Sequence, residues 1–361
     1  MAAFFGPNPK FANPSIRRKE DREAKYARYL GELLQHVTPV SQSGSCMACG
    51  SREANAERVF REIYPLTGSG DFLNCFSFFE SGLPLCSTCV LATQFSPFYM
   101  ISKGGRLALI HSHNVRLMLN IARAAVRHIR GLTAAGGELA FYAPNIYLGK
   151  RNEEFLVNLV YKDILKRGEL YGHTAIRMYV FTNYGQINEL DYIDLSTHVF
   201  KFLEEASTGA LRQCLDELFE SSGPGIYPRL VAGENIELFF INRKERRMVG
   251  GWQLFELYLR MVEEMDPKRI ETIKKVGEKL YQYLKKTGFK KLDDLEMVEN
   301  YQTFFVELNK IQKEAPVWEI EDLTSLFPED KEGRILWRET RNILLGYIYG
   351  LKHKDEEVRK P

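Results

Sequence analysis

The 361-residue sequence contains no Asp or Glu between residues 81 and 137, although 47 of its residues are acidic. It also lacks any uncharged apolar run of about 18 residues, so a membrane-spanning helix is not expected. The first residues include no apolar core of a secretory signal, and we expect a cytoplasmic protein. Six cysteines are too few for a disulfide-stabilised scaffold.

Common catalytic motifs are missing as well. The sequence has no Gly-x-x-x-x-Gly-Lys-Ser/Thr loop, no Gly-x-Gly-x-x-Gly loop, no His-Glu-x-x-His pair and no Gly-x-Ser-x-Gly turn. His111-Ser-His113 leaves open a metal-dependent enzyme, but hydrolytic metal sites usually include carboxylates and none lies nearby. Contact with phosphate, or capping of the next helix, is the favoured interpretation of the two histidines. We therefore expect a protein that is not an enzyme.

The net charge of +2 hides a separation of charge along the chain. Residues 252–361 carry 20 bases and 22 acids, which leaves 49 − 20 = 29 bases and 47 − 22 = 25 acids for residues 1–251. Such a basic segment would attract a phosphate backbone without carboxylate repulsion, whereas the alternative is a solvated face that binds nothing. The bases of the acid-free segment are Lys103, Arg106, Arg116, Arg123, Arg127 and Arg130.

Four of the six cysteines form two Cys-x-x-Cys pairs, Cys46 with Cys49 and Cys86 with Cys89. Each pair can present two sulfurs to one ion from a tight turn, and two pairs complete the tetrahedral thiolate set that zinc prefers. Free buried thiols or a redox pair are the alternatives. A closed set of four thiolates predicts a structural zinc site rather than a catalytic one. Cys75 and Cys214 are expected in the core.

Hydrophobic periodicity predicts mixed helix and strand before residue 250. We expect helices over residues 26–34, 53–62 and 153–166, and a β-hairpin over residues 98–110. Asn114 should cap a helix over residues 115–131, with Val115, Leu119 and Ile129 on its apolar face and its arginines opposite. Strands are expected over residues 71–79, 139–142, 175–182, 227–230 and 237–241.

After Gly250-Gly251 the pattern becomes entirely helical, with helices expected over residues 252–286, 293–312, 320–327 and 332–352. The fold class is therefore α+β. A mixed α/β domain over residues 1–250, with an inserted four-cysteine zinc-knuckle module at about residues 40–95, precedes an all-α helical bundle over residues 251–361.

Two further groups of residues are candidates for contact with nucleic acid. One is a basic cluster at the tip of an expected hairpin, composed of Arg243, Lys244, Arg246 and Arg247. The other is the loop after the strand over residues 175–182, where Asn183 and Gln186 could read base edges. An ordinary turn is the alternative for that loop.

Taken together, these motifs resemble a known family. Cys46-x-x-Cys49-Gly, Leu85-Cys-x-x-Cys89, Gln94-x-x-Pro97 and Lys103-Gly-Gly-Arg-Leu-x-Leu-Ile-His111 are similar to the CRISPR-associated CXXC-CXXC proteins, the large subunit of type I-B Cascade. The resemblance is densest over residues 40–115 and extends loosely to Phe181-Thr-Asn-Tyr-Gly-Gln186. Family members usually have more sequence before the region that begins here at Phe4, so we expect a short variant or one that lacks an N-terminal part.

The resemblance implies a non-catalytic subunit of an RNA-guided surveillance complex. Such a subunit would contact the protospacer-adjacent motif in target DNA, help to open the duplex and stabilise the R-loop, while pairing with the guide RNA supplies sequence specificity. Its implied partners are the backbone and guide-processing subunits of the CRISPR RNA-protein complex, target DNA and the helicase-nuclease, with no membrane. A stand-alone zinc-ribbon nucleic-acid-binding protein, a metal-dependent enzyme that uses His111 and His113, and a purely structural scaffold remain alternatives.

Overall fold

The computed structural model groups the chain into two compact units, which are described separately below. Unit 1 comprises Met1–Asn145 and Ile176–Asp194, and unit 2 comprises Ile146–Ala175 and Leu195–Pro361. The domain boundary that the sequence predicts near residue 250 stays a prediction. The structure describes residues 19–35, 44–50, 53–56, 58–60, 63, 67, 82–103, 105–136, 149–167, 170–182 and 189–358.

Unit 1 is built on a four-stranded sheet in the order β1 (Ile101–Lys103), β2 (Arg106–His111), β3 (Ile176–Phe181) and β4 (Leu190–Leu195). The first three strands pair antiparallel, which confirms the expected hairpin over residues 98–110. Ala108 and Ile110 of β2 lie opposite Val180 and Met178 of β3, and all four are buried. Alternation along the strands therefore gives the sheet one core face.

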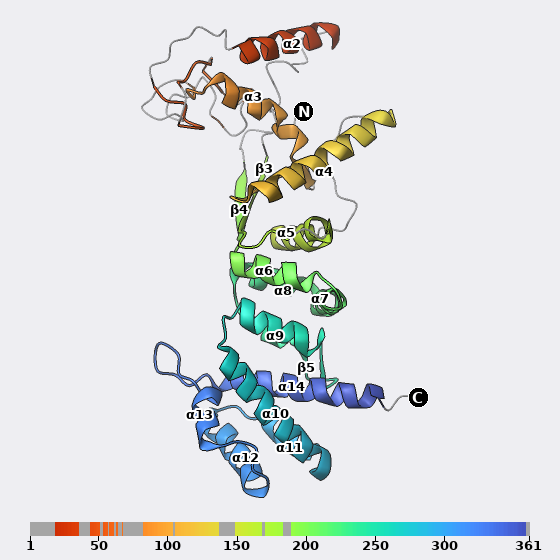
Figure 1. Cartoon of the computed structure of the whole chain (residues 1–361), viewed down its shortest axis with the longest axis vertical. Coiled ribbons are helices and arrows are strands. Elements are labelled where there is room, and N and C mark those ends of the chain that lie inside the picture. Colours follow the sequence, from red (N-terminus) through yellow and green to blue (C-terminus); the bar gives the residue numbers. More distant parts are fainter. Residues whose placement is uncertain are drawn as a thin grey trace. The chain divides into compact units, whose positions relative to one another are not determined.

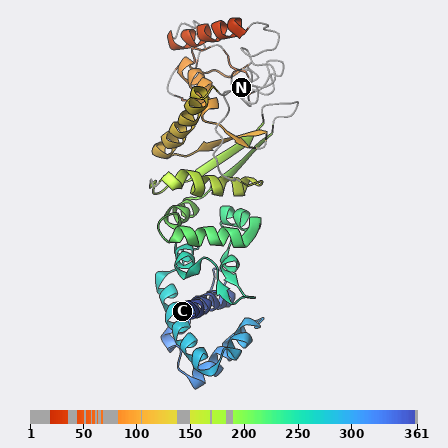
Figure 2. The same cartoon turned by 90° about the vertical axis from the view of Figure 1, so that its right-hand side faces the viewer.

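Helix α4 (Val115–Ala134) lies beside this sheet in Figures 1 and 2. As expected, Asn114 caps it, because its side chain accepts a hydrogen bond from the backbone N–H of Leu117 at 3.1 Å. The expected apolar face was wrong in part, since Val115 and Leu119 are 69% and 48% exposed whereas Leu117 is fully buried. The buried stripe follows the side of α4 that carries Leu117, Ile121, Ala124, Ala125 and Ile129.

Unit 1 also contains helices α2 (Lys19–Gln35) and α3 (Ser87–Phe95), which pack against each other (Figure 1). The helix expected over residues 53–62 is wrong, because the described residues of that segment are extended and pair with residues that precede α3. The strands expected over residues 71–79 and 139–142, and the buried position expected for Cys75, lie outside the described residues.

Unit 2 is mainly helical. Its helices before residue 250 are α5 (Asn152–Leu159), which continues through a π-helical turn, α6 (Thr197–Ala206), α7 (Leu211–Ser222) and α8 (Ile226–Ala232). The strand expected over residues 227–230 is wrong, since α8 occupies this segment and buries Ile226, Tyr227 and Leu230. Most of the strand expected over residues 237–241 is a 3-10 helix, and pairing begins only at β5 (Ile241–Asn242), which forms a hairpin with β6 (Arg247–Met248).

The helices after Gly250 are α9 (Gly251–Met261), α10 (Pro267–Thr287), α11 (Lys290–Glu296), α12 (Tyr301–Glu314), α13 (Ile320–Leu326) and α14 (Trp337–Val358). The single helix expected over residues 252–286 is two helices. Pro267 occupies the first turn of α10, where a residue without a backbone N–H is tolerated, and Asp266 caps that turn by accepting from Lys268 N at 2.9 Å. Among the described residues, no helix is long and apolar enough to cross a membrane.

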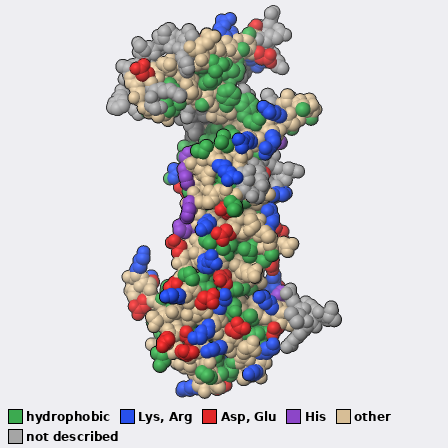
Figure 3. All heavy atoms as spheres, viewed as in Figure 1, with side chains coloured by type: hydrophobic (Ala, Val, Ile, Leu, Met, Phe, Trp, Pro, Cys, Tyr) green, Lys and Arg blue, Asp and Glu red, His purple; other side chains and the backbone are tan. Residues whose placement is uncertain are grey.

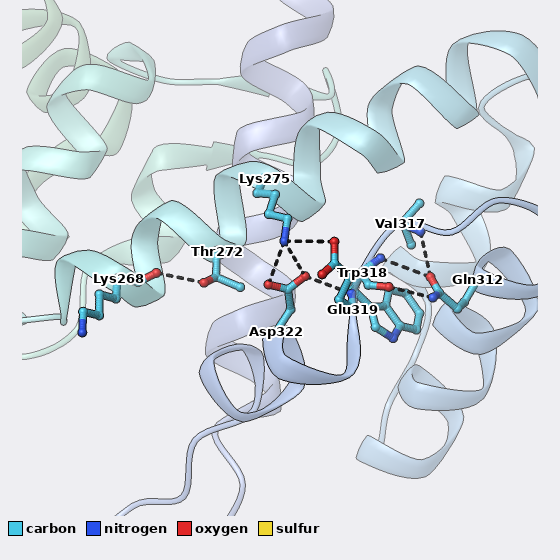
Figure 4. Close-up of polar contacts among 8 residues, drawn as sticks. All are labelled: Lys268, Thr272, Lys275, Gln312, Val317, Trp318, Glu319 and Asp322. Carbon is cyan, nitrogen blue, oxygen red and sulfur yellow. Dashed lines mark hydrogen bonds and ion pairs between the residues drawn. The ribbon is translucent and has the colours of Figure 1, made fainter.

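Polar contacts connect α10, α12 and α13 (Figure 4). Lys275 of α10 donates to both oxygens of Asp322, at 3.1 and 3.0 Å, while Asp322 Oδ2 accepts from the backbone N–H of Glu319 at 2.9 Å. Gln312 of α12 accepts from the backbone N–H groups of Val317 and Trp318 at 2.7 and 3.1 Å. One carboxylate thus caps α13 and binds α10, which fixes the short helix in the bundle.

Close packing of α10 on α14 depends on Gly277. A Cβ atom there would lie 2.6 Å from Cδ1 of Tyr347, whose ring is buried and packs on Trp252 at 4.6 Å between ring centroids. Gly277→Ala should therefore lower the free energy of unfolding by about 1–3 kcal/mol, because the buried Tyr347 ring would have to shift to admit the methyl group. Gly350→Ala in α14 is the matched control, since its nearest neighbour would be Met248 Sδ at 3.7 Å and alanine favours a helix by about 1 kcal/mol. Urea denaturation midpoints that move equally for both variants would contradict this.

A buried carboxyl group in unit 2 predicts a pH-dependent stability. Glu237 is 2% exposed and its Oε1 has no hydrogen-bond partner among the described residues. Burial and the nearby charge of Glu339 raise its pKa from 4.5 to about 8. The unfolded chain therefore loses this proton first, and the native state is progressively destabilised as the pH rises from 4.5 to about 8.

Glu237→Gln, which cannot ionise, should be more stable than the unaltered protein by a few kcal/mol above pH 8, because each pKa unit corresponds to about 1.36 kcal/mol. The difference should shrink with falling pH and vanish below pH 4.5. Denaturant titrations at several pH values measure it, and a difference independent of pH would exclude titration of Glu237 as the cause.

Candidate metal centre and basic surface

The first cysteine pair lies on a tight turn. The backbone N–H of Gly50 donates to the carbonyl of Cys46 at 2.8 Å, and Gly50 has a φ of +64°, a conformation that glycine adopts without strain. The turn brings Cys49 back beside Cys46, with Cys46 buried and Cys49 exposed. Gly50, directly after Cys49, therefore allows the tight turn that the sequence predicts.

The second pair begins a helix. Cys86 is the N-cap residue of α3 and Cys89 lies in its first turn, where Val90 N donates to the carbonyl of Cys86 at 3.1 Å. Ser87 donates to Asn55 Oδ1 twice, from its backbone N–H at 2.8 Å and from its hydroxyl at 3.1 Å. The partial positive charge at the start of a helix favours thiolates in this position.

Backbone hydrogen bonds join the two pairs. Met47 N donates to Pro84 O at 3.1 Å, and Val59 and Leu83 exchange hydrogen bonds at 3.2 and 3.0 Å. Ala56 N donates to Leu85 O at 3.0 Å. Met47, Ala56 and Val59 therefore each pair with the backbone of residues 83–85, and this pairing replaces the helix expected over residues 53–62.

The four sulfurs of Cys46, Cys49, Cys86 and Cys89 all lie within 4.8 Å of one another. Tetrahedral zinc with Zn–S bonds of about 2.3 Å requires sulfur–sulfur distances of about 3.8 Å. The four sulfurs would therefore need to move only slightly closer together to coordinate an ion. A disulfide needs sulfurs about 2.05 Å apart, and all four residues are free thiols. The chemistry and spacing of these donors therefore fit a single metal ion.

The thiols of this cluster influence one another's ionisation. Burial disfavours the thiolate of Cys46, but nearby backbone N–H groups, including that of Cys86, outweigh burial and lower the pKa of Cys46. Burial and hydrogen bonds to the other sulfurs raise the pKa of Cys89. Four adjacent thiolates repel one another, so their joint deprotonation requires a cation between them.

Among the described residues, a cluster of buried apolar side chains surrounds the cysteines. Cys46 and Cys86 pack with Val59, Leu85 and Val90, and Leu33 of α2 adds the contact that holds this helix to α3. A bound metal ion would add to this packing, because metal binding and folding are coupled.

Neither His111 nor His113 takes part in a metal-ligating group within the described ranges. Both side chains are exposed, His111 at the end of β2 and His113 just before α4. Tyr99, which lies in the same acid-free segment, has an internal role instead. Its hydroxyl donates to Ile110 O at 2.5 Å and contacts Met118 Sδ at 3.2 Å, which attaches β2 to α4.

The arginines of α4 are exposed on one side of the helix. Arg116, Arg123, Arg127 and Arg130 are spaced by seven, four and three residues, which places them on the same face, away from the buried stripe. Figure 3 shows basic side chains over the part of the chain that Figure 1 labels α4. Arg123, Arg127 and Arg130 form no ion pair with a described residue, so their charge is available to a ligand.

Several of the remaining predicted bases have partners within their own units. Arg106 forms an ion pair with Glu189, and Lys103 ends β1. In unit 2, Arg246 pairs with Glu296 at 3.1 Å and also with Asp293, and Arg247 pairs with Glu245 at 2.8 Å and also with Glu217.

Arg243 donates to Asn342 at 3.1 Å, and Lys244 is exposed at the tip of the β5–β6 hairpin. These contacts make Arg243, Arg246 and Arg247 structural cations of unit 2, and their binding of nucleic acid stays a prediction. Asn183 and Gln186 lie outside the described residues.

Unit 1 thus combines a four-cysteine cluster that could bind a metal ion with an exposed basic helix. Residues 39–101 match the sequence model of a family described as CRISPR-associated protein (Cas_CXXC_CXXC). This match contains both cysteine pairs and ends at β1, and it supports a CRISPR-associated CXXC-CXXC protein with a role in CRISPR systems. No curated protein and no solved structure matches the chain.

Replacement of one ligand tests the metal centre. Cys46→Ser should lower the metal content of the purified protein from about one ion per chain to near zero, because serine is a poor ligand for the ion that four thiolates select. The same variant should unfold the region around the four cysteines at a lower temperature, since metal binding and folding are coupled.

Cys214→Ser is the control, because Cys214 lies on α7 outside the cluster and should leave the metal content unchanged. Elemental analysis of freshly purified protein, together with proteolysis of unit 1, measures both effects. Unaltered protein that carries no metal would overturn the assignment.

Proposed function

We propose that the chain is the non-catalytic large subunit of a type I CRISPR RNA-guided surveillance complex, or Cascade. The observation that carries this proposal is the coincidence of the family match with the four-cysteine cluster, whose second pair lies within the acid-free segment that exposes basic residues. The family match by itself supports membership of a CRISPR effector complex. The finer role below is argued from the charge and geometry of unit 1.

The metal in this proposal is structural zinc. Four thiolates leave no open coordination position for a substrate or an activated water, so the centre would hold residues 44–95 together rather than catalyse a reaction. The module would act as a rigid base from which the chain enters β1, β2 and α4. A subunit without a catalytic centre fits a complex in which a separate helicase-nuclease degrades the target.

The nucleic-acid surface in this proposal is the arginine face of α4. Exposed cations bind phosphates by releasing counterions, and this binding depends little on sequence. The subunit would use this face to hold target DNA near the protospacer-adjacent motif and to stabilise the R-loop, while the guide RNA reads the sequence. Backbone and guide-processing subunits would be its partners, and it would help to recruit the helicase-nuclease.

A stand-alone zinc-ribbon protein that binds nucleic acid is the second candidate, because the family match covers the cysteine module and not the rest of the chain. Co-expression with the backbone and guide-processing subunits and a guide RNA separates the two candidates. A Cascade subunit should co-elute with the assembled ribonucleoprotein at a larger size than the isolated chain. Elution at the same size with and without the other components would favour the stand-alone protein.

Charge reversal on α4 tests the proposed surface. The combined variant Arg116→Glu, Arg123→Glu and Arg127→Glu should weaken duplex and single-stranded DNA binding similarly for all sequences. It should also reduce the slope of log K against log salt by about 2–3, since each phosphate contact contributes about 0.7–0.9. Fluorescence anisotropy at several salt concentrations measures both quantities.

The matched control reverses three exposed lysines of unit 2, Lys286, Lys313 and Lys331, and so changes the net charge equally. This control should leave the salt slope close to that of the unaltered protein. An equal loss of binding in both triple variants would attribute the effect to net charge and exclude α4 as the DNA surface.

A further inference from the structure

One face of the sheet in unit 1 exposes aromatic rings. Tyr192 of β4 is 56% exposed, and its ring centroid lies 6.5 Å from that of Tyr179 on the neighbouring strand β3. Leu190, two residues earlier on the same side of β4, is 55% exposed. Large apolar groups that cluster on an exposed sheet face often mark a binding site.

An arginine lies across both rings. The Arg177 guanidinium carbon is 4.7 Å from the centroid of Tyr192 and 6.0 Å from that of Tyr179. Asp194 holds this guanidinium with two hydrogen bonds, to Nε at 2.6 Å and to an Nη at 2.7 Å, and the ion pair holds the pKa of Asp194 below its usual range. The rings and the guanidinium are therefore set in place before any ligand arrives.

The charge of this face is compatible with a polyanion. Asp194 is neutralised by Arg177, and His111 of β2 lies directly opposite Arg177 in the register of the sheet, exposed on the same side. Planar rings and a fixed guanidinium plane offer stacking surfaces, which every nucleobase can use whatever the sequence. Bases are accessible for such stacking only when a strand is unpaired.

We infer that Tyr179, Tyr192 and Arg177 form a stacking platform for the bases of a single-stranded nucleic acid. Tyr192 supplies the outer surface, Arg177 bridges the two rings, and Asp194 positions Arg177. The platform is separate from the α4 arginines, which would contact phosphates rather than bases. The choice of a nucleic-acid ligand rests on the proposed function, but the contacts that form the platform do not.

The experiment compares the full-length protein and its variants on three labelled oligonucleotides of one length: single-stranded DNA, single-stranded RNA of the same sequence, and an abasic DNA strand. The abasic strand keeps the phosphates and removes the stacking partners. Tyr192→Ala should weaken binding of the DNA with bases by about tenfold, within the usual range for loss of one aromatic–base stack, and leave abasic binding unchanged. The RNA arm reports which kind of strand the platform prefers.

Two variants serve as controls. Tyr192→Phe keeps the ring and should bind like the unaltered protein, and Leu190→Ala removes an equally exposed aliphatic side chain from the same strand and should change binding less than twofold. Because Tyr192 is exposed, the thermal unfolding midpoints of all variants should coincide.

Several results would overturn the stacking platform: equal losses on normal and abasic strands, an unchanged affinity in Tyr192→Ala, a loss in Tyr192→Phe as large as in Tyr192→Ala, or no binding of any single strand at low salt. Charge reversal of α4 gives a distinct signature, because it should weaken normal and abasic strands equally. A loss in Tyr192→Ala without any effect of α4 reversal would reject the proposed α4 surface and leave the stacking platform standing.

Discussion

The described part of the N-terminal module is organised around four sulfur atoms that lie within 4.8 Å of one another. The pairs come from a turn at Cys46 and from the first turn of α3, and the described chain between them is held mainly by a few backbone hydrogen bonds. Thiols in such a cluster cannot all ionise unless a cation balances their charge. The same ion would therefore close the module, order the start of α3 and fix the direction in which the chain enters the sheet.

Electrostatics differ between the two units in how cations are used. In unit 2 Arg246, Arg247 and Lys275 form ion pairs with acids of the same unit, so nearby carboxylates neutralise their charge. In unit 1 the absence of acids between residues 81 and 137 leaves the α4 arginines without acidic neighbours in the sequence. Arg177 combines the two situations. It is paired with Asp194, which orients the guanidinium, and the guanidinium still lies over two aromatic rings. Net charge alone would miss all three roles.

Sequence patterns predicted the grouping of the four cysteines, the β1–β2 hairpin and the Asn114 cap, because spacing and local hydrogen bonding determine these features. They failed where tertiary contacts decide. The β-prone residues 227–230 became helix α8, since a helix buries their apolar side chains among other helices. The platform was missed because Tyr179 and Tyr192 lie on different strands and each resembles an ordinary sheet residue. Arg177 and Tyr179 alternate in one strand, as do Tyr192 and Asp194 in the next, and this was the available signal. Only the pairing of β3 with β4 shows which residues meet.

The strands β3 and β4 lie in a segment, residues 176–194, that is inserted between two parts of unit 2 in the sequence. During synthesis both cysteine pairs and α4 are made before β3, so a metal ion could close the cysteine cluster while the sheet still consists of β1 and β2 alone. The sheet is completed only after residues 146–175, which belong to the other unit, have been made. No single cut in the chain separates the two units intact, and the aromatic rings of β3 and β4 are joined to unit 2 at both ends of their segment.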